Sequence, residues 1–253
     1  MKTRQRTKTG AALVLFVLAV ATCARLHADE AEDRAVRAIQ KLGGYFRRDE
    51  KAQNKPIVAV SLSLTNCADA GLKDLAGLKQ LQRLDVSFTK VTDTGLKELI
   101  GLKQLQVLSL EFTELTDVGV KHLAEIKQLQ TLDLGGTKMT DAGLKHLSGL
   151  TQLQTLELSQ TKVTDTGLKQ LTGLKQLQTL NLFRTKVTDA GLKHLAGLNR
   201  LEWLSLRETN VTDTGLKELI GLKRLQTLGL GGTTVTDAGR ADLKKALPEL
   251  QIM

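Results

Sequence analysis

A 24-residue unit is repeated eight times in succession between Ile57 and Pro248, and this repetition limits the possible folds more than any other feature of the chain. The most regular copy, residues 153–176, reads LQTLELSQTKVTDTGLKQLTGLKQ. One unit of this length cannot enclose a core alone, whereas stacked units bury a continuous one. We therefore predict a single solenoid in which each copy contacts only its neighbours.

Each copy is predicted to begin with a short β-strand. When positions are numbered from the first residue of each copy, positions 4 and 6 are apolar in all eight copies, as in Leu84 and Val86. Alternation of this kind buries one face of a strand and leaves the other open. We expect eight parallel strands, one per copy, that start near position 3.

The second half of each copy is predicted to contain a short helix. Position 13 is Asp and position 15 is Gly in every copy, as in Asp93 and Gly95, and apolar residues, nearly all Leu, follow at a spacing of three. An Asp or Thr before such a run caps a helix, and the spacing suits one or two tight helical turns. Lys97 follows Asp93 by four residues, an order that favours an ion pair on a helix. We interpret the Asp row as helix caps rather than calcium ligands, because calcium-binding repeats offer several oxygen ligands in one loop.

Position 9 is Thr in all eight copies. The chain leaves the strand at this point, so buried backbone groups lose their ladder partners. A Thr hydroxyl can donate and accept a hydrogen bond. We therefore predict a structural role for the column of Thr65, Thr89, Thr113, Thr137, Thr161, Thr185, Thr209 and Thr233.

Both ends of the repeat array are predicted to carry atypical segments, as solenoid ends require. Residues 29–56 are interpreted as an N-terminal cap that contains a helix from about residue 31 to residue 42 and a short strand from Tyr45. At the other end Arg240 replaces the apolar residue, Leu or Val, that follows Gly in the other copies, and apolar residues then recur at α-helical spacing. Residues 249–253 complete a C-terminal cap.

Residues 1–28 have the pattern of an export signal. A basic start is followed by an apolar run from Ala11 to Val20, and Leu26-His27-Ala28 can end the signal. The run is shorter than the roughly 20 residues of an ordinary membrane span. We predict export to the periplasm, the cell surface or the medium, with a retained N-terminal anchor or lipidation at Cys23 as alternatives.

The net charge of +9 overstates how basic the folded part is. Residues 29–253 carry 31 basic and 27 acidic side chains, a net charge of +4, which gives no reason to expect nucleic acid as a partner. Without the signal, Cys67 is the only cysteine, so no intramolecular disulfide can form. Its slot is apolar in the other copies, and we interpret it as a buried core residue.

The chain carries no motif of an enzyme, cofactor site or metal site. His122, His146 and His194 share one position on the helical side of the repeat, and no nucleophile or carboxylate is placed with them. Phosphate loops, dinucleotide fingerprints and zinc spacings are absent. We predict a non-enzymatic protein without cofactors. Carboxylates on neighbouring strands, such as Asp85 and Asp133, leave a hydrolase as the enzymatic alternative.

The run V-T-D-x-G-L-x-x-L, at residues 91–99, 187–195 and 211–219, resembles the cysteine-containing leucine-rich repeat of F-box substrate adaptors, which is also ribonuclease-inhibitor-like. The uniform 24-residue version with Thr in place of Cys is similar to exported bacterial leucine-rich-repeat proteins. This resemblance implies an α/β, right-handed solenoid with a parallel concave sheet and short helices on the convex side. The segment of residues 29–56 is too short to contain an F-box. A role as a substrate adaptor is therefore supported only by the resemblance of the repeats.

Positions 3, 5, 7 and 8 vary among the copies and are predicted to line the concave face and its rim. Every aromatic residue of the repeats falls at one of these positions. Exposed aromatic residues beside Arg are typical of protein-binding hot spots. We therefore predict a partner-binding surface whose residues are Phe183, Arg184, Trp203, Arg207, Glu208, Phe88 and Phe112, with the first five as its anchor.

Together these observations favour an exported recognition module, expected to be a monomer, that binds a protein, a peptide or a glycan on its concave face. No nucleic-acid partner and no membrane span in the mature chain are expected. The alternative is a passive structural or envelope protein in which the repeats form a stable rod.

Overall fold

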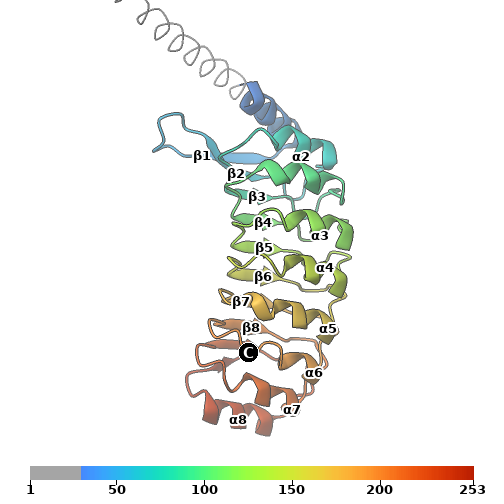
Figure 1. The fold of residues 1–253 in the computed structure, drawn as a ribbon, viewed down its shortest axis with the longest axis vertical. Helices are drawn as coiled ribbons and strands as arrows, with labels where there is room; N and C mark the ends of the chain where they lie inside the picture. The colour runs from blue at the N-terminus through green and yellow to red at the C-terminus, as the bar shows by residue number, and fades with distance from the viewer. Residues whose placement is uncertain (1–29) are drawn as a thin grey trace, which may run out of the picture.

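The computed structural model describes residues 30–253 as one elongated stack, with strands along one side and short helices along the other (Figure 1). All the strands belong to a ten-stranded sheet whose spatial order follows the order of the chain. The predicted α/β leucine-rich-repeat-like solenoid is confirmed. The predicted export signal and Cys23 lie outside the described residues.

The repeat strands are parallel and in register, with partners 24 residues apart, such as Leu84 with Leu108. Most occupy positions 3 to 5 of their copy, as predicted from the alternation. The strands are β2 (Ile57–Ser61), β3 (Arg83–Asp85), β4 (Val107–Ser109), β5 (Thr131–Asp133), β6 (Thr155–Glu157), β7 (Thr179–Asn181), β8 (Trp203–Ser205) and β9 (Thr227–Gly229).

Helices of mixed α and 3-10 type return the chain to the next strand, in agreement with the leucine spacing of three. They are α2 (Asp69–Leu75), η1 (Gly95–Gly101), α3 (Asp117–Leu123), α4 (Asp141–Leu147), α5 (Asp165–Leu168), η2 (Lys169–Gly173), α6 (Asp189–Leu192), α7 (Asp213–Leu216), η3 (Lys217–Leu219) and α8 (Asp237–Ala246). None of the helices within residues 30–253 combines the length and the apolar character that crossing a membrane requires.

One continuous core runs between the sheet and the helices. Position 4 and 6 side chains from the strands, such as Leu132 and Leu134, meet helix leucines such as Leu144, and all three are fully buried. Burying a Leu side chain contributes roughly 1.5–3 kcal/mol relative to exposure. Cys67 belongs to this core, and burial raises the pKa of its thiol to about 11, with Asp69 adding to the effect.

The two ends of the stack differ from the repeats. A helix over residues 30–42 buries Ala35 and Ile39 against the first copy. β1 (Tyr45–Arg48) pairs antiparallel with β2, which is the one exception to the parallel arrangement in the described sheet. At the other end β10 (Gln251–Ile252) adds a final parallel strand beside β9.

The prediction that the position 13 Asp side chains cap helices is wrong. Thr116, one residue earlier, is the cap, because its hydroxyl accepts from the N–H of Val118 at 3.2 Å. The Asp117 carboxylate instead accepts from the N–H and the hydroxyl of Thr140 in the next copy, at 2.8 and 2.7 Å. Six further Asp residues make the same double contact, namely Asp69, Asp93, Asp141, Asp165, Asp189 and Asp213.

This use of the Asp row explains two other features of the repeat. A Cβ added at Gly143 would lie 2.6 Å from Asp117 Oδ1, so the position 15 glycine makes room for the carboxylate of the preceding copy. The expected ion pair between Asp93 and Lys97 is absent from the described residues, because the carboxylate is already engaged by the next copy.

The predicted structural role of the Thr column is confirmed. Thr161 is buried and its hydroxyl donates to the carbonyl of Leu158, three residues earlier, at 2.7 Å. The other seven position 9 Thr residues make the same bond. Each hydroxyl therefore satisfies the strand end of its own copy.

Candidate functional site

The side of the sheet turned away from the helices carries the variable positions 3, 5 and 7, with position 8 at its rim. We call this surface the sheet face. Figure 1 shows the helices along the opposite side of the sheet only, so none of the described helices covers this surface. The side chains on this face differ from copy to copy, because packing in the core does not constrain them.

Position 8 has a left-handed backbone in every copy. Gly136 and Gly232 have φ values of 65° and 76°, which glycine adopts without strain. For other residues this conformation costs roughly 1–2 kcal/mol each. The six strained residues are Leu64, Phe88, Phe112, Gln160, Arg184 and Glu208, with φ between 49° and 60°.

Three strained residues form what we call the apolar ridge: Leu64, Phe88 and Phe112. Their exposed fractions are 79%, 45% and 39%. The two Phe rings stack with their centroids 4.8 Å apart and an interplanar angle of 24°. The ring of Phe112 then lies over Gly136, where an added Cβ would be 2.5 Å from Phe112 Cδ1. The rings of Phe88 and Phe112 thus each contact the next copy.

Four carboxylates from neighbouring copies lie beside the ridge and form what we call the acidic row: Asp85, Glu111, Asp133 and Glu157. Asp85 Oδ1 accepts from the hydroxyl of Ser87 at 2.7 Å, and Asp133 Oδ1 accepts from the N–H of Gly135 at 2.9 Å. None of the ion pairs within residues 30–253 involves the row.

The environment of three members of the acidic row disfavours their negative charge. Burial is the largest influence and raises the pKa of Glu111, Asp133 and Glu157 above the usual carboxyl range. Repulsion from Asp85 and Asp133 adds to the rise at Glu111. Hydrogen bonds from Gly135 and Ser109 act in the opposite direction at Asp133. The row is therefore a concentration of like charge.

The five residues predicted as the binding anchor lie together on adjacent copies. Arg184 Nε contacts Glu208 Oε2 at 2.5 Å, and the Arg184 guanidinium lies 5.0 Å from the ring centroid of Phe183. Trp203 is half-buried at the start of β8. Arg207 is exposed and its stem lies over the next strand, where a Cβ at Gly229 would be 3.1 Å from Arg207 Cγ. Most of these five residues thus contact other residues of the chain. Phe88 and Phe112 lie apart from them, in the second and third copies.

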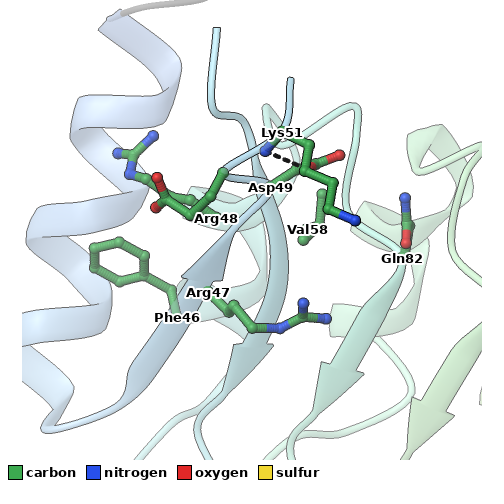
Figure 2. A pocket seen from close by; sticks show the side chains of 8 residues that line it. Phe46, Arg47, Arg48, Asp49, Lys51, Val58 and Gln82 are labelled. Carbon is green, nitrogen blue, oxygen red and sulfur yellow. Dashed lines mark hydrogen bonds between the residues drawn. The ribbon is translucent and has the colours of Figure 1, made fainter. Parts of the chain in front are cut away.

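Two hollows at the N-terminal end of the sheet are bordered by β1. One of about 690 Å³ is lined by Phe46, Arg47, Asp49 and Lys51 among others (Figure 2). The second, of about 440 Å³, opens on the sheet face. Its lining residues are Tyr45, Phe46, Arg47, Ala59, Val60, Ser61, Arg83, Leu84, Asp85, Val107 and Ser109.

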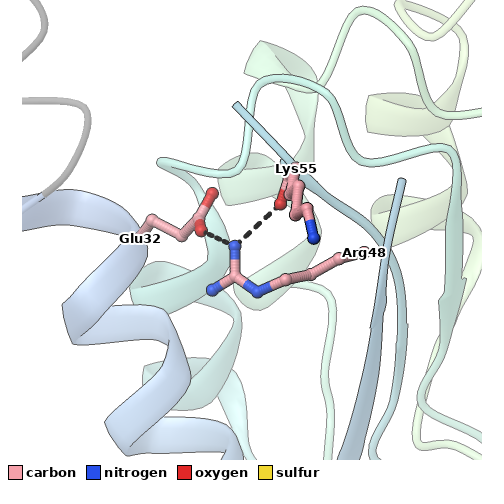
Figure 3. Close-up of polar contacts among 3 residues, drawn as sticks. All are labelled: Glu32, Arg48 and Lys55. Carbon is pink, nitrogen blue, oxygen red and sulfur yellow. Dashed lines mark hydrogen bonds and ion pairs between the residues drawn. The ribbon is translucent and has the colours of Figure 1, made fainter. Parts of the chain in front are cut away.

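Beside the first hollow Arg48 has a structural role. Its guanidinium forms an ion pair with Glu32 of the N-terminal helix and donates to the carbonyl of Lys55 at 2.8 Å (Figure 3). Arg48 thereby holds the N-terminal helix against the loop between β1 and β2. Within residues 30–253 no group of three or more His, Cys, Asp or Glu side chains is placed to hold a metal ion.

Sequence reasoning missed the left-handed backbone at position 8 and, with it, Leu64. The signal was present in Gly136 and Gly232, because glycine at one repeat position often marks a positive φ. The other six copies have larger residues at position 8, which do not indicate a positive φ from sequence alone. The acidic row was recognised only in part, since Glu111 occupies position 7 whereas Asp85, Asp133 and Glu157 occupy position 5.

Comparison with known proteins agrees with this geometry. Family models described as leucine rich repeat match residues 103–163 and 127–187, and a second such family matches residues 79–99. No curated protein sequence matches the chain significantly.

Two solved structures of internalins from Listeria monocytogenes are similar in fold. Internalin inlF is 24% identical with a TM-score of 0.61, over 71% of this chain and 49% of its own. Internalin C2 is 24% identical with a TM-score of 0.64, over 87% of this chain and 92% of its own. The chain thus spans about half the length of the first. These matches show leucine-rich repeats within residues 79–99 and 103–187, and they show that the chain has the fold of a leucine-rich-repeat solenoid.

Proposed function

We propose that the chain is an exported, non-enzymatic recognition module that binds a protein or peptide partner through the sheet face. The observation that carries this proposal is the row of strained residues at position 8. Six copies keep a larger side chain where the backbone favours glycine, and three of these side chains are exposed and apolar. Strain of this kind, retained at a surface, is characteristic of binding sites.

The predicted surface comprises two groups of residues on this face. Phe88 and Phe112 belong to the apolar ridge, and the second group contains Phe183, Arg184, Trp203, Arg207 and Glu208. A passive structural protein is the alternative, and for it the side chains at positions 3, 5, 7 and 8 would be interchangeable. A glycan in place of a peptide would use the same face.

Site-specific photo-crosslinking in the native host tests the proposal. A photoreactive residue at Ser109 lies on the sheet face, and a matched one at Glu218 lies on the helix side. We expect a defined protein adduct from Ser109 and none of comparable yield from Glu218. Adducts from Glu218 alone, or from neither position, would contradict binding through the sheet face.

Export is proposed from the pattern of residues 1–28, and the Thr-containing repeat is proposed as a variant of the cysteine-containing subtype. The N-terminus of the chain isolated from its host tests the export signal. A mature chain that begins at Asp29 supports cleavage, whereas an intact start at Met1 supports a retained anchor. A lipid on Cys23 would indicate attachment to a membrane.

A further inference from the structure

We infer that the N-terminal half of the sheet face binds a basic peptide segment of a protein partner, with Lys or Arg side chains against the acidic row and apolar side chains on either side of them. This inference rests on the proposed function and specifies the chemistry of the partner. Two apolar features, the ridge and the 440 Å³ hollow, flank the row.

The acidic row accepts hydrogen bonds but forms no ion pair with a cation among residues 30–253. Arg83, two residues before Asp85 on β3, and Arg207, farther along the sheet, form no ion pair with the row among the described residues. A cation from a partner would offset the mutual repulsion of these carboxylates and their loss of water contact. Complementary charge of this kind favours binding and speeds encounter.

Glu111 and Asp133 converge on the position of Gly135. A Cβ at this position would lie 3.2 Å from Asp133 Oδ1, 3.3 Å from Glu111 Cγ and 2.7 Å from Ser159 Oγ. Because the two acidic side chains lie this close to one point, a single cationic group at the surface can interact with both carboxylates. An Arg guanidinium suits such a site, since it donates to two carboxylates in a fixed geometry.

Apolar contacts lie on both sides of the acidic row. At the start of the strands the hollow is lined by the exposed ring of Tyr45 and by the partly exposed Ala59 and Val107. At the end of the strands Phe88 and Phe112 present their stacked rings. A segment that runs along the strand direction therefore meets apolar, acidic and apolar surface in that order. This order predicts a partner sequence in which basic residues are flanked by large apolar ones.

The C-terminal half of the sheet face does not offer the same chemistry. Glu208 is already paired with Arg184, and the Arg184 guanidinium also lies over Phe183. Arg207 extends over Gly229 and Gly231 of the next copy. Beyond Glu157, none of the described sheet-face positions of copies five to eight carries an unpaired carboxylate, and a basic segment there meets the positive charge of Arg207. The observations thus favour the N-terminal half for a basic partner.

Fluorescence anisotropy with synthetic peptides tests this inference on the purified chain. The probes carry two adjacent Arg residues flanked by Leu and Phe, and the matched probes carry citrulline, which has nearly the same shape without the charge. We expect the Arg probes to bind at least about tenfold more tightly than the citrulline probes, with an affinity that falls as salt is added.

Two sets of variants assign the contacts. Glu111→Gln with Asp133→Asn should weaken Arg-probe binding at least about tenfold and leave citrulline-probe binding unchanged. Phe88→Gly with Phe112→Gly should weaken the binding of the Arg probe and of the citrulline probe by equal factors, because both probes keep the same apolar residues. The control pair Glu98→Gln and Glu218→Gln removes the same charge from the helix side and should change the affinity by less than about twofold.

Equal affinity for the Arg and citrulline probes would overturn the inference, and so would Arg-probe binding that resists the acidic-row substitutions. A crosslinked partner that binds the sheet face independently of Glu111 and Asp133 would also overturn it, while leaving the proposed function intact. Self-association of the chain that these substitutions abolish would make a second copy the occupant, and would equally overturn it.

Discussion

Asp165 and Thr188, which lie in consecutive copies, are joined by two hydrogen bonds: Asp165 Oδ1 accepts from the backbone N–H at 2.8 Å and Oδ2 accepts from the hydroxyl at 2.6 Å. Seven such junctions run along the solenoid. Since stability in a repeat protein depends strongly on contacts between neighbours, these bonds are major determinants of stacking.

Replacing Asp165 with Ala should destabilise the chain by about 2 kcal/mol, because two charge-assisted hydrogen bonds to the next copy are lost. Urea denaturation followed by circular dichroism measures the change. Lys169→Ala on the same helical segment is the control and should change stability little, because Lys169 is exposed and forms no ion pair among the described residues. Equal effects of the two substitutions would contradict the assigned role of Asp165.

Replacing Thr161 with Val should cost about 1 kcal/mol, because the carbonyl of Leu158 loses the hydroxyl at 2.7 Å and keeps only the backbone N–H of Thr161 at 3.3 Å. Thr172→Val is a matched control, since the exposed Thr172 hydroxyl donates to the carbonyl of Lys169 in the same way. Water can replace that bond at the surface. Comparable losses in melting temperature for both variants would show that burial of the hydroxyl does not determine how much the Thr column contributes to stability.

Replacing Leu64 with Gly should stabilise the chain by about 0.5–1 kcal/mol, because relief of the left-handed strain exceeds the entropy that Gly adds to the unfolded chain. Leu64→Ala removes the same side chain and retains the strained backbone, so it should give no gain. Equilibrium unfolding of the two variants makes the comparison. An Ala variant as stable as the Gly variant would argue against strain at position 8.

Replacing Glu111 with Gln should stabilise the chain at neutral pH by a few tenths to about 1 kcal/mol. The folded-state pKa of Glu111 lies above its ordinary value, chiefly through burial, so the folded chain binds more protons than the unfolded chain. Its unfavourable contribution is therefore present above the raised pKa and is lost as the pH falls toward the unfolded value. The advantage of the Gln variant should vanish near about pH 3; a gain that is independent of pH would refute the electrostatic explanation.

Much of the fold was predictable because the information is local and repeated eight times. The apolar pairs at positions 4 and 6, such as Leu132 and Leu134, report which side of each strand is buried. Leucines spaced by three correctly indicated tight helical turns. The role of the Asp row was not predictable in this way, because the partner of Asp117 is Thr140 in the next copy.

The candidate site was predictable only in part. The variable positions indicated the sheet face, and Phe88 and Phe112 were recognised as members of it. Their stacking depends on a left-handed backbone that six larger side chains conceal. The pairing of Arg184 with Glu208 follows from their shared position in adjacent copies, whereas the placement of Arg184 over Phe183 required coordinates.

Hydroxyl-radical footprinting tests binding through the sheet face most directly, by comparing oxidation of the chain in its native host with oxidation of the purified chain. Exposed apolar side chains on both sides of the solenoid serve as probes: Leu64, Phe88 and Phe112 on the sheet side, and Val118 and Ile220 on the helix side. We predict strong protection of the first three residues in the host and unchanged oxidation of the other two. Unchanged oxidation of Phe88 and Phe112, with protection confined to Val118 and Ile220, would contradict the account.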